Sequence, residues 1–128
     1  RRFHAEAFRV LRAGGHFALS EVTLGKGGLP FYPTPWSEDG TTSHLRTEEE
    51  TLAGLQGAGF HVLSVLDRSE ATIVFLRRMR ERIAREGPPR IGTHILMGPD
   101  AREKARNSAR NVEEGRIKPI EVLCRKPD

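Results

Sequence analysis

Six side chains whose chemistry suits the binding of a small organic molecule stand out in this sequence. They are Glu21, Tyr32, Trp36, His44, His94 and Met97. A carboxylate can orient an amine or a hydroxyl group, aromatic faces attract cations, and histidine can serve as a general base or form hydrogen bonds. Each also has an ordinary explanation: the polar end of a strand, packing in the core, or a hydrogen-bonded histidine. The residues therefore indicate a binding pocket and leave the catalytic residue unknown.

Other kinds of site find no support in the residue pattern. Asp39, His44 and His94 lack the spacing of metal ligands, so we expect no metal. Ser20 lacks the sharp strand-to-helix turn that surrounds a nucleophilic serine. Asn107 and Asn111 lie four residues apart in a predicted helix, from which they can bond to backbone, and a structural role is favoured over a chemical one. We therefore expect the chemistry to depend on how the protein orients the bound molecule.

The long segment 25–46 should carry part of the pocket. It contains three of the eight aromatic residues of the chain, Phe31, Tyr32 and Trp36. Loops of more than about 12 to 15 residues tend to be functional or disordered, and aromatic side chains argue against disorder. We interpret the segment as a lid or a substrate-lining loop, the alternative being that its rings only pack on the core. Gly25, Gly27 and Gly28 precede Pro30 rather than a helix and predict a flexible stretch.

The elements that must position these residues begin with an amphipathic helix over residues 1–13. Phe3, Ala7, Val10 and Leu11 recur on one of its faces, with Phe8 beside them. Gly14 and Gly15 can then reverse the chain into an apolar strand over 17–24. A helix that returns into such a strand is half of a βαβ unit. Because the preceding strand is not in the sequence, we expect a piece of a longer polypeptide.

Further elements follow from caps and periodicity. Thr47 and Glu50 form a capping box that starts a helix whose inner face is Leu52, Leu55 and Ala58. The almost continuously apolar run 60–66 predicts a strand covered on both faces. The remaining predictions are a helix over 70–85, an ambiguous strand or helix over 91–97, a helix from about 100 to 115 with a small-residue face, and a last strand over 120–124.

Charge and cysteine content limit the partners and the location. The net charge is +4, and the densest basic cluster, residues 77–85, is interleaved with apolar residues like the solvated face of a helix. We therefore expect no nucleic acid, although arginine-rich stretches can bind it. The single cysteine, Cys124, excludes a disulfide framework and favours a reduced cytoplasmic setting. No apolar run is long enough to cross a membrane, so no membrane partner is expected.

Several blocks resemble one enzyme family. The run FRVLRAGG at 8–15, followed by HFALSEV at 16–22, resembles the RVL(K/R)PGG helix and fifth strand of class I S-adenosylmethionine-dependent methyltransferases. Ala13 stands where that family usually has proline. The blocks at 31–45, 94–98 and 110–117 resemble small-molecule methyltransferases of the sarcosine/dimethylglycine type. The glycine-rich loop and the acidic strand end with which such enzymes hold the cofactor are not in this sequence.

The resemblance implies a fold and an arrangement. The fold class is α/β, the C-terminal half of a Rossmann-like methyltransferase fold. Its three-stranded mixed sheet has the last strand antiparallel between the other two, with flanking and capping helices. Residues 1–128 would form one domain on the substrate side, with 70–116 as a helical cap. The first strand would present an open edge, which predicts a homodimer.

The implied function is substrate recognition in an S-adenosylmethionine-dependent methyltransferase whose acceptor is a small molecule, with an amine as one candidate. We expect these 128 residues to lack turnover, because the main cofactor-binding loop is not among them. The alternative is a non-catalytic binding or oligomerisation module that keeps the methyltransferase-like fold.

Overall fold

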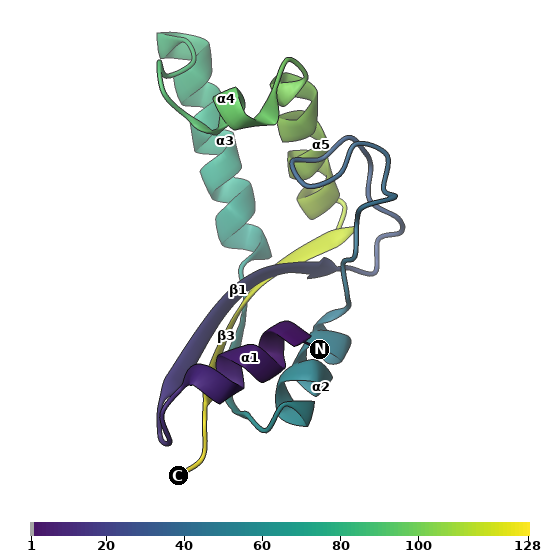
Figure 1. The fold of residues 1–128 in the computed structure, drawn as a ribbon. Helices are drawn as coiled ribbons and strands as arrows, with labels where there is room; N and C mark the ends of the chain where they lie inside the picture. The colour runs from purple at the N-terminus through teal and green to yellow at the C-terminus, as the bar shows by residue number, and fades with distance from the viewer. Residues whose placement is uncertain (1) are drawn as a thin grey trace. The chain divides into compact units, whose positions relative to one another are not determined.

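The computed structural model describes residues 2–128, and these divide into two compact units (Figure 1). Unit 1 consists of the segment up to Leu24 together with Leu45–Arg68 and Lys118–Asp128. Unit 2 consists of Gly25–His44 and Ser69–Ile117. The elements are, in order, α1 (Arg2–Val10), β1 (His16–Leu24), α2 (Glu48–Gly57), β2 (His61–Asp67), α3 (Ser69–Glu86), α4 (Thr93–Met97), α5 (Ala101–Glu113) and β3 (Ile117–Arg125).

The three strands form one sheet in the order β1-β3-β2, which confirms the predicted order of first, last and middle strand. β2 runs antiparallel to β3, with Val65 opposite Val122 and a bulge between Val62 and Ser64. At the other side of β3, Gly14 donates to the Lys126 carbonyl and Lys126 donates to that of Gly15. The start of β1 therefore meets the end of β3, and this pairing is antiparallel as well.

The core of unit 1 lies on one face of this sheet. Its buried residues are Leu55, Phe60, Ile120, Val122 and Cys124. Helices α1 and α2 cover that face, with the predicted inner residues of α2 packed against the core (Figure 1). The Phe60 ring lies edge-on to Phe8 and stacks on Phe17, with centroid distances of 5.1 and 5.3 Å. This aromatic cluster holds helix α1 on the sheet.

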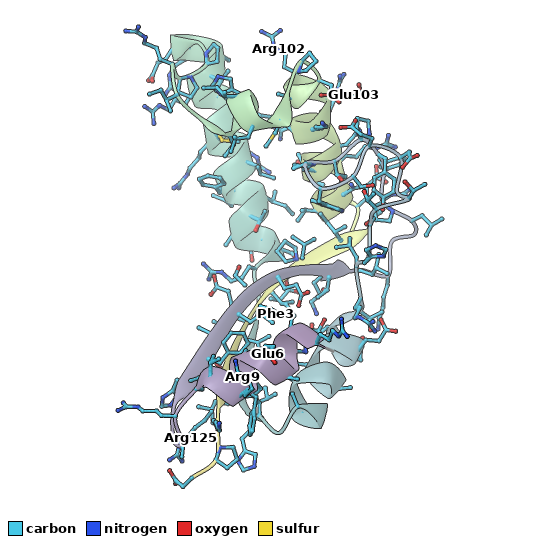
Figure 2. The ribbon with its side chains drawn as sticks, in the orientation of Figure 1. Phe3, Glu6, Arg9, Arg102, Glu103 and Arg125 are labelled. Atoms are coloured by element: carbon cyan, nitrogen blue, oxygen red, sulfur yellow. The ribbon has the colours of Figure 1, made fainter. Side chains whose placement is uncertain are left out.

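The inner face of α1 differs from the predicted one. Phe3 and Val10 are 62% and 68% exposed, whereas Ala7, Phe8 and Leu11 pack against the core. Figure 2 shows Phe3 on the same helix as the exposed Glu6–Arg9 pair, whose atoms lie 2.9 Å apart. Phe8, which the sequence places beside the predicted face, packs on Phe60, and the departure from the prediction is that Phe3 and Val10 are exposed.

The prediction that the second strand is covered on both faces was wrong. Val62 and Val65 pack on the core, but Leu63 and Leu66 are 51% and 52% exposed among the described residues. An uninterrupted apolar run makes a strand suitable for burial on both faces. Whether both faces are buried depends on which other elements pack against them. In unit 1 both helices that pack on the core do so from one face.

Helix α2 begins as its sequence predicts. The Thr47 hydroxyl accepts from the Glu50 amide at 3.2 Å, and the Glu50 carboxylate accepts from the Thr47 amide at 2.9 Å. This reciprocal pair satisfies two of the amides that a helix start leaves free. Glu48, in the first turn, also pairs with Lys118 of β3, whose ammonium reaches Asp67 of β2 as well. The pairs join the start of α2 to two strands.

Unit 2 is built from helices α3, α4 and α5 and the loop 25–44. Helix α3 packs along α5, and an exposed Arg80–Glu113 pair of 3.3 Å links them. Two residues of the predicted small-residue face of α5, Ala109 and Val112, are buried. The ambiguous stretch 91–97 contains the short helix α4, which packs on α5. Unit 2 therefore brings the aromatic loop and the predicted cap helices into one compact body.

Candidate functional site

The loop that carries the aromatic residues is tied down where it begins. The amides of Gly25 and Gly27 donate to the carbonyls of Arg116 and Gly115, at 2.9 Å each. A Cβ atom on Gly25 would lie 2.0 Å from the Gly115 oxygen, and one on Gly27 would lie 2.0 Å from the Glu114 oxygen. The predicted flexible stretch is thus a hydrogen-bonded crossing of two backbones, and glycine is required because no side chain fits between them.

Two asparagines of α5 hold the next part of the loop. The Asn111 side chain is fully buried; its Oδ1 accepts from the Phe31 amide at 2.7 Å and its Nδ2 donates to the Phe31 carbonyl at 3.0 Å. Nδ2 of Asn107 donates to the Pro33 carbonyl at 3.0 Å. The expected role of these asparagines, bonding to backbone from the cap helix, is confirmed.

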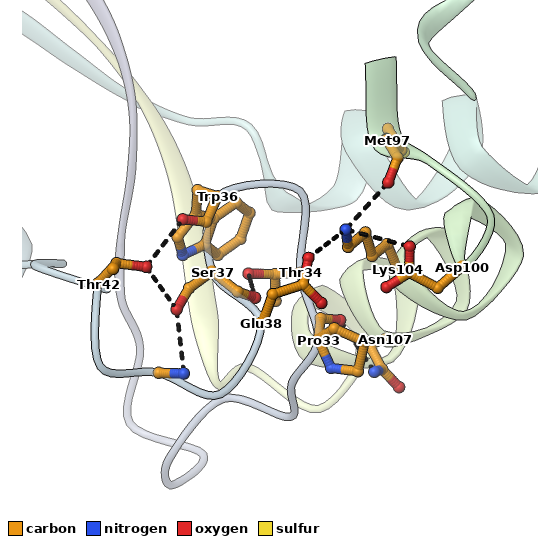
Figure 3. Close-up of polar contacts among 11 residues, drawn as sticks. Pro33, Thr34, Trp36, Ser37, Glu38, Thr42, Met97, Asp100, Lys104 and Asn107 are labelled. Atoms are coloured by element: carbon orange, nitrogen blue, oxygen red, sulfur yellow. Dashed lines mark hydrogen bonds and ion pairs between the residues drawn. The ribbon is translucent and has the colours of Figure 1, made fainter. Parts of the chain in front are cut away.

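Lys104, one turn earlier on α5, holds the far part of the loop (Figure 3). Its ammonium lies 2.5 Å from a Glu38 oxygen, 3.0 Å from the Met97 carbonyl and 3.2 Å from Asp100 Oδ1. The side chain is only 8% exposed, and a buried ammonium requires such partners. Lys104 therefore joins the loop, the end of α4 and the start of α5.

Lys104 and Asp100 each favour the charged form of the other. The hydrogen bond to Glu38 is the largest effect on the lysine, and it raises the pKa of the Lys104 ammonium despite the opposing effect of burial. At Asp100, burial favours the neutral acid, but the hydrogen bond from Lys104 and its charge outweigh this and lower the pKa of the Asp100 carboxyl. Both groups are charged near neutral pH, which keeps the link intact.

Two arginine side chains contact the aromatic ring of Phe31. The guanidinium carbons of Arg110 and Arg116 lie 3.8 and 4.0 Å from the centre of its ring. Glu114 accepts a hydrogen bond from each arginine, and these bonds, that of Arg110 foremost, lower the pKa of its carboxyl. The two arginines thus stay over the aromatic ring.

The loop also has internal structure around its other aromatic residues. Thr34 and Ser37 exchange two backbone hydrogen bonds of 2.7 and 3.3 Å, which close a tight turn around Trp36. The indole Nε1 donates to the Ser43 hydroxyl at 3.2 Å. The Tyr32 ring lies against Gly40, where a Cβ atom would come within 2.8 Å of it. Tyr32 and Trp36 are accordingly placed by contacts inside the loop.

The six candidate residues fall into both units. Tyr32, Trp36, His44, His94 and Met97 belong to unit 2, while Glu21 lies on β1 in unit 1. Within unit 2, Lys104 joins Met97 to the segment that carries Trp36 and Glu38. His44 is exposed, and His94 is half-buried with its ring beside Gly92. Glu21 Oε2 is buried and has no hydrogen-bond partner among the described residues.

Sequence reasoning missed Lys104 and a hollow in unit 1. Lys104, Asn107 and Asn111 follow the i, i+3, i+7 spacing of one helical face, and that spacing was the signal available for Lys104. The hollow has a volume of about 520 Å³ and its lining includes His4, Arg46 and Glu50. None of the six predicted residues lines it.

Neither a metal-binding cluster nor a membrane-spanning helix is present among residues 2–128. No group of three or more His, Cys, Asp or Glu side chains is arranged to hold a metal ion there. None of the helices in this range combines the length and the apolar character that crossing a membrane requires.

The fold matches those of solved methyltransferases. A phosphoethanolamine N-methyltransferase 2 from Haemonchus contortus, in complex with phosphomonomethylethanolamine and S-adenosylhomocysteine, superimposes with a TM-score of 0.75 at 14% identity over 99% of this chain. A protein described as a sarcosine dimethylglycine methyltransferase from Galdieria sulphuraria gives 0.70 at 12% identity over 98%. The [4+2]-cyclase SpnF gives 0.62 at 26% identity over 98%. No protein-family model and no curated protein matches the sequence.

The matched region is only part of each of those proteins. This chain spans 30%, 46% and 44% of the three structures, respectively. The order β1-β3-β2, with the last strand antiparallel in the middle, is the arrangement that the resemblance implied. The chain therefore has the α/β fold of the C-terminal part of a class I S-adenosylmethionine-dependent methyltransferase.

Proposed function

We propose that this chain is the acceptor-binding part of an S-adenosylmethionine-dependent methyltransferase that acts on a small molecule. The observation that carries the proposal is the structural match over 98 to 99% of the chain, with TM-scores of 0.75 and 0.70, to two methyltransferases of small amines. The wholly anchored aromatic loop of unit 2 supports it, because methyl transfer by in-line displacement depends above all on orientation and on exclusion of water.

An amine is the acceptor class that the candidate residues favour. The π faces of Tyr32 and Trp36 attract a protonated or quaternary amine. In unit 1, Glu21 Oε2 is buried without a hydrogen-bond partner among the described residues, which keeps Glu21 as a candidate for binding an amine or hydroxyl group. His44 and His94 remain candidates for a general base, and Met97 for a contact with the acceptor. The printed names of two neighbours, a phosphoethanolamine and a sarcosine dimethylglycine methyltransferase, agree with this choice.

The cofactor is held by residues outside this sequence. The glycines closest to a cofactor-binding fingerprint, Gly25 and Gly27, are used for the backbone crossing onto Gly115 and do not form a cradle. S-adenosylmethionine, when bound, would supply the methyl group. The residues of this chain would bind and orient the acceptor and keep water from it.

Calorimetric titration tests whether the cofactor is bound by residues outside this sequence. The 128-residue chain should show no measurable binding of S-adenosylmethionine and no turnover. A protein that continues upstream through a glycine-rich loop should bind the cofactor and methylate a member of a panel of small amines. Micromolar cofactor binding by the 128 residues alone would refute the claim that the cofactor is held by other residues. A complete protein that binds the cofactor and methylates no amine in the panel would refute the amine assignment.

A second candidate function is supported by the cyclase SpnF, which matches at 26% identity with the same fold. The fold can therefore belong to a protein named for another reaction, and a module without methyl transfer remains the alternative, whether it binds ligands or assembles. The two candidates differ in the fate of the methyl group. Formation of S-adenosylhomocysteine that depends on added acceptor supports the methyltransferase, whereas its absence in a cofactor-binding protein supports the alternative.

Self-association and location extend the proposal. β1 lies at an edge of the sheet and α1 exposes Phe3 and Val10, so a second copy could cover either surface. We expect a homodimer by light scattering, and a monodisperse monomer would contradict it. The single buried cysteine supports a reducing, cytoplasmic setting.

A further inference from the structure

We infer that Lys104, Asn107 and Asn111 are positioning residues that hold loop residues 31–38 in one conformation, so that Tyr32 and Trp36 form a fixed wall of the acceptor site rather than part of a mobile lid. The assignment of that wall to an acceptor site depends on the proposed function. The immobility of the loop does not, because it follows from contacts within unit 2 alone.

The first argument is the regular spacing of the three side chains. Residues 104, 107 and 111 lie on one face of α5, and they contact loop residues 38, 33 and 31, in reverse order. Figure 3 shows the first two of these contacts. The loop therefore runs antiparallel to the helix and is held at three successive points. A single anchor would leave the loop free to pivot, but three along its length define both its path and its register.

The second argument is the burial of the anchors. Asn111 is 0% exposed and both ends of its amide are used by one residue, Phe31. This arrangement imitates the paired hydrogen bonds of a β-ladder. If the loop moved away, two buried polar groups of Asn111 and a buried ammonium on Lys104 would each lose a partner, which opposes opening.

The third argument is the order within the loop itself. The backbone pair between Thr34 and Ser37, the Trp36–Ser43 bond and the contact of Tyr32 with Gly40 connect the anchored points to the two aromatic rings. Fixing residues 31, 33 and 38 therefore fixes the rings between them. A wall that is already in its bound conformation lowers the ordering cost of binding, so we expect the acceptor to be selected by fit to a preformed surface.

Trp36 makes the inference testable, because it is the only tryptophan of the chain. The quenching of its fluorescence by acrylamide reports on the mobility of the loop. The test variants are Asn111→Leu, which keeps the volume and removes both hydrogen bonds, and Lys104→Met, which removes the charge. Arg106→Ala is the matched control, since Arg106 is an exposed residue of the same helix. Lys104→Arg is the conservative variant that should rescue.

We expect the quenching constant to rise at least twofold in Asn111→Leu and in Lys104→Met, with faster hydrogen exchange at residues 31–38 and an unchanged far-ultraviolet circular dichroism spectrum. Arg106→Ala and Lys104→Arg should behave like the parent chain. Parent-like quenching in both folded test variants would overturn the inference. If Asn111→Leu does not fold, Asn107→Ala carries the same test, and parent-like quenching in that variant and in Lys104→Met would be equally decisive.

The outcome is separable from that of the proposed function. Raised quenching in a protein that transfers no methyl group would leave the fixed loop standing and remove its assignment to an acceptor site. Methyl transfer together with parent-like quenching in the variants would overturn the fixed loop and leave the proposed function standing.

Discussion

Gly59 lies directly against the ring of Phe8, so that a Cβ atom on Gly59 would stand 2.9 Å from two ring carbons. Gly59 also has a φ angle of +104°, which side-chain-bearing residues rarely adopt. It follows the C-terminus of α2, and the Phe8 ring is in turn edge-on to the buried Phe60. The turn between α2 and β2 thus depends on glycine for two separate reasons, its conformation and its lack of a side chain.

We therefore predict opposite effects for alanine at two nearby glycines. Gly59→Ala should lower the free energy of unfolding by at least about 1 to 2 kcal/mol, the cost of a left-handed residue, with the clash against Phe8 added. Gly57, at the end of α2, has nothing within 4 Å of an added Cβ, and Gly57→Ala should stabilise by up to about 1 kcal/mol. Urea denaturation measures both. Equal effects would contradict the packing of Phe8 on this turn.

The capping box of α2 gives a second prediction. Thr47→Ala removes the side chain that accepts from the Glu50 amide, so the free energy of unfolding should fall by about 1 kcal/mol. Gln56→Ala, at an exposed site of the same helix, should change it by no more than about 0.5 kcal/mol. Thermal unfolding of the two variants would decide, and a Thr47→Ala midpoint equal to that of Gln56→Ala would show that the cap carries no stability.

A third prediction concerns the only thiol. Cys124 is 0% exposed, and burial raises the pKa of its thiol above the ordinary value of 9.0. A raised pKa in the folded state contributes stability below the unfolded value, and that contribution is lost as the pH rises through the folded one. Labelling with a disulfide reagent at pH 8 should therefore be negligible until urea unfolds the chain. Rapid labelling without denaturant would contradict the burial.

The Lys104 contacts give a pH prediction. The folded-state pKa of Lys104 is raised above its ordinary value of 10.5, so its contribution should persist at neutral pH and be lost as the pH rises beyond that value. The pKa of Asp100 is lowered from 3.8, so its contribution should be lost only when the pH falls below that value. Trp36 emission should therefore stay constant between these limits and change in alkali.

Lys104→Met is the control for the alkaline change, because it lacks the titrating group. In that variant the emission of Trp36 should already differ at pH 7 and show no separate transition above pH 10.5. An alkaline transition of the same size in both proteins would assign it to a group other than Lys104.

Local signals in the sequence predicted local structure well. The Thr47–Glu50 capping box is present as predicted, because both partners lie within one helical turn and need nothing from the rest of the chain. For Asn107 and Asn111 the residue type and helical position predicted bonds to backbone, but not that the partners would be the distant residues 33 and 31. The strand order came from the family resemblance, since periodicity carries no information about which strands are neighbours.

Other features depended on residues far away in the sequence. The predicted inner face of α1 contained Phe3 and Val10, yet both are exposed, whereas Phe8 packs on Phe60. Likewise β2 reads as a strand buried on both faces, but Leu63 and Leu66 are exposed among the described residues. An apolar side chain shows a tendency to be buried, and only the arrangement of other elements supplies the surface that buries it.

By itself the sequence determined where most helices and strands lie and that the chain is of α/β class. The tertiary structure decided how the loop 25–44 is held. Lys104 reads as one more solvated cation in a basic helix, and it becomes an anchor only because its side chain is buried and Glu38, 66 residues earlier, and the Met97 carbonyl contact its ammonium. Hydrogen bonds and ion pairs between distant segments follow from the packing of the whole unit, and no local pattern of residues specifies them.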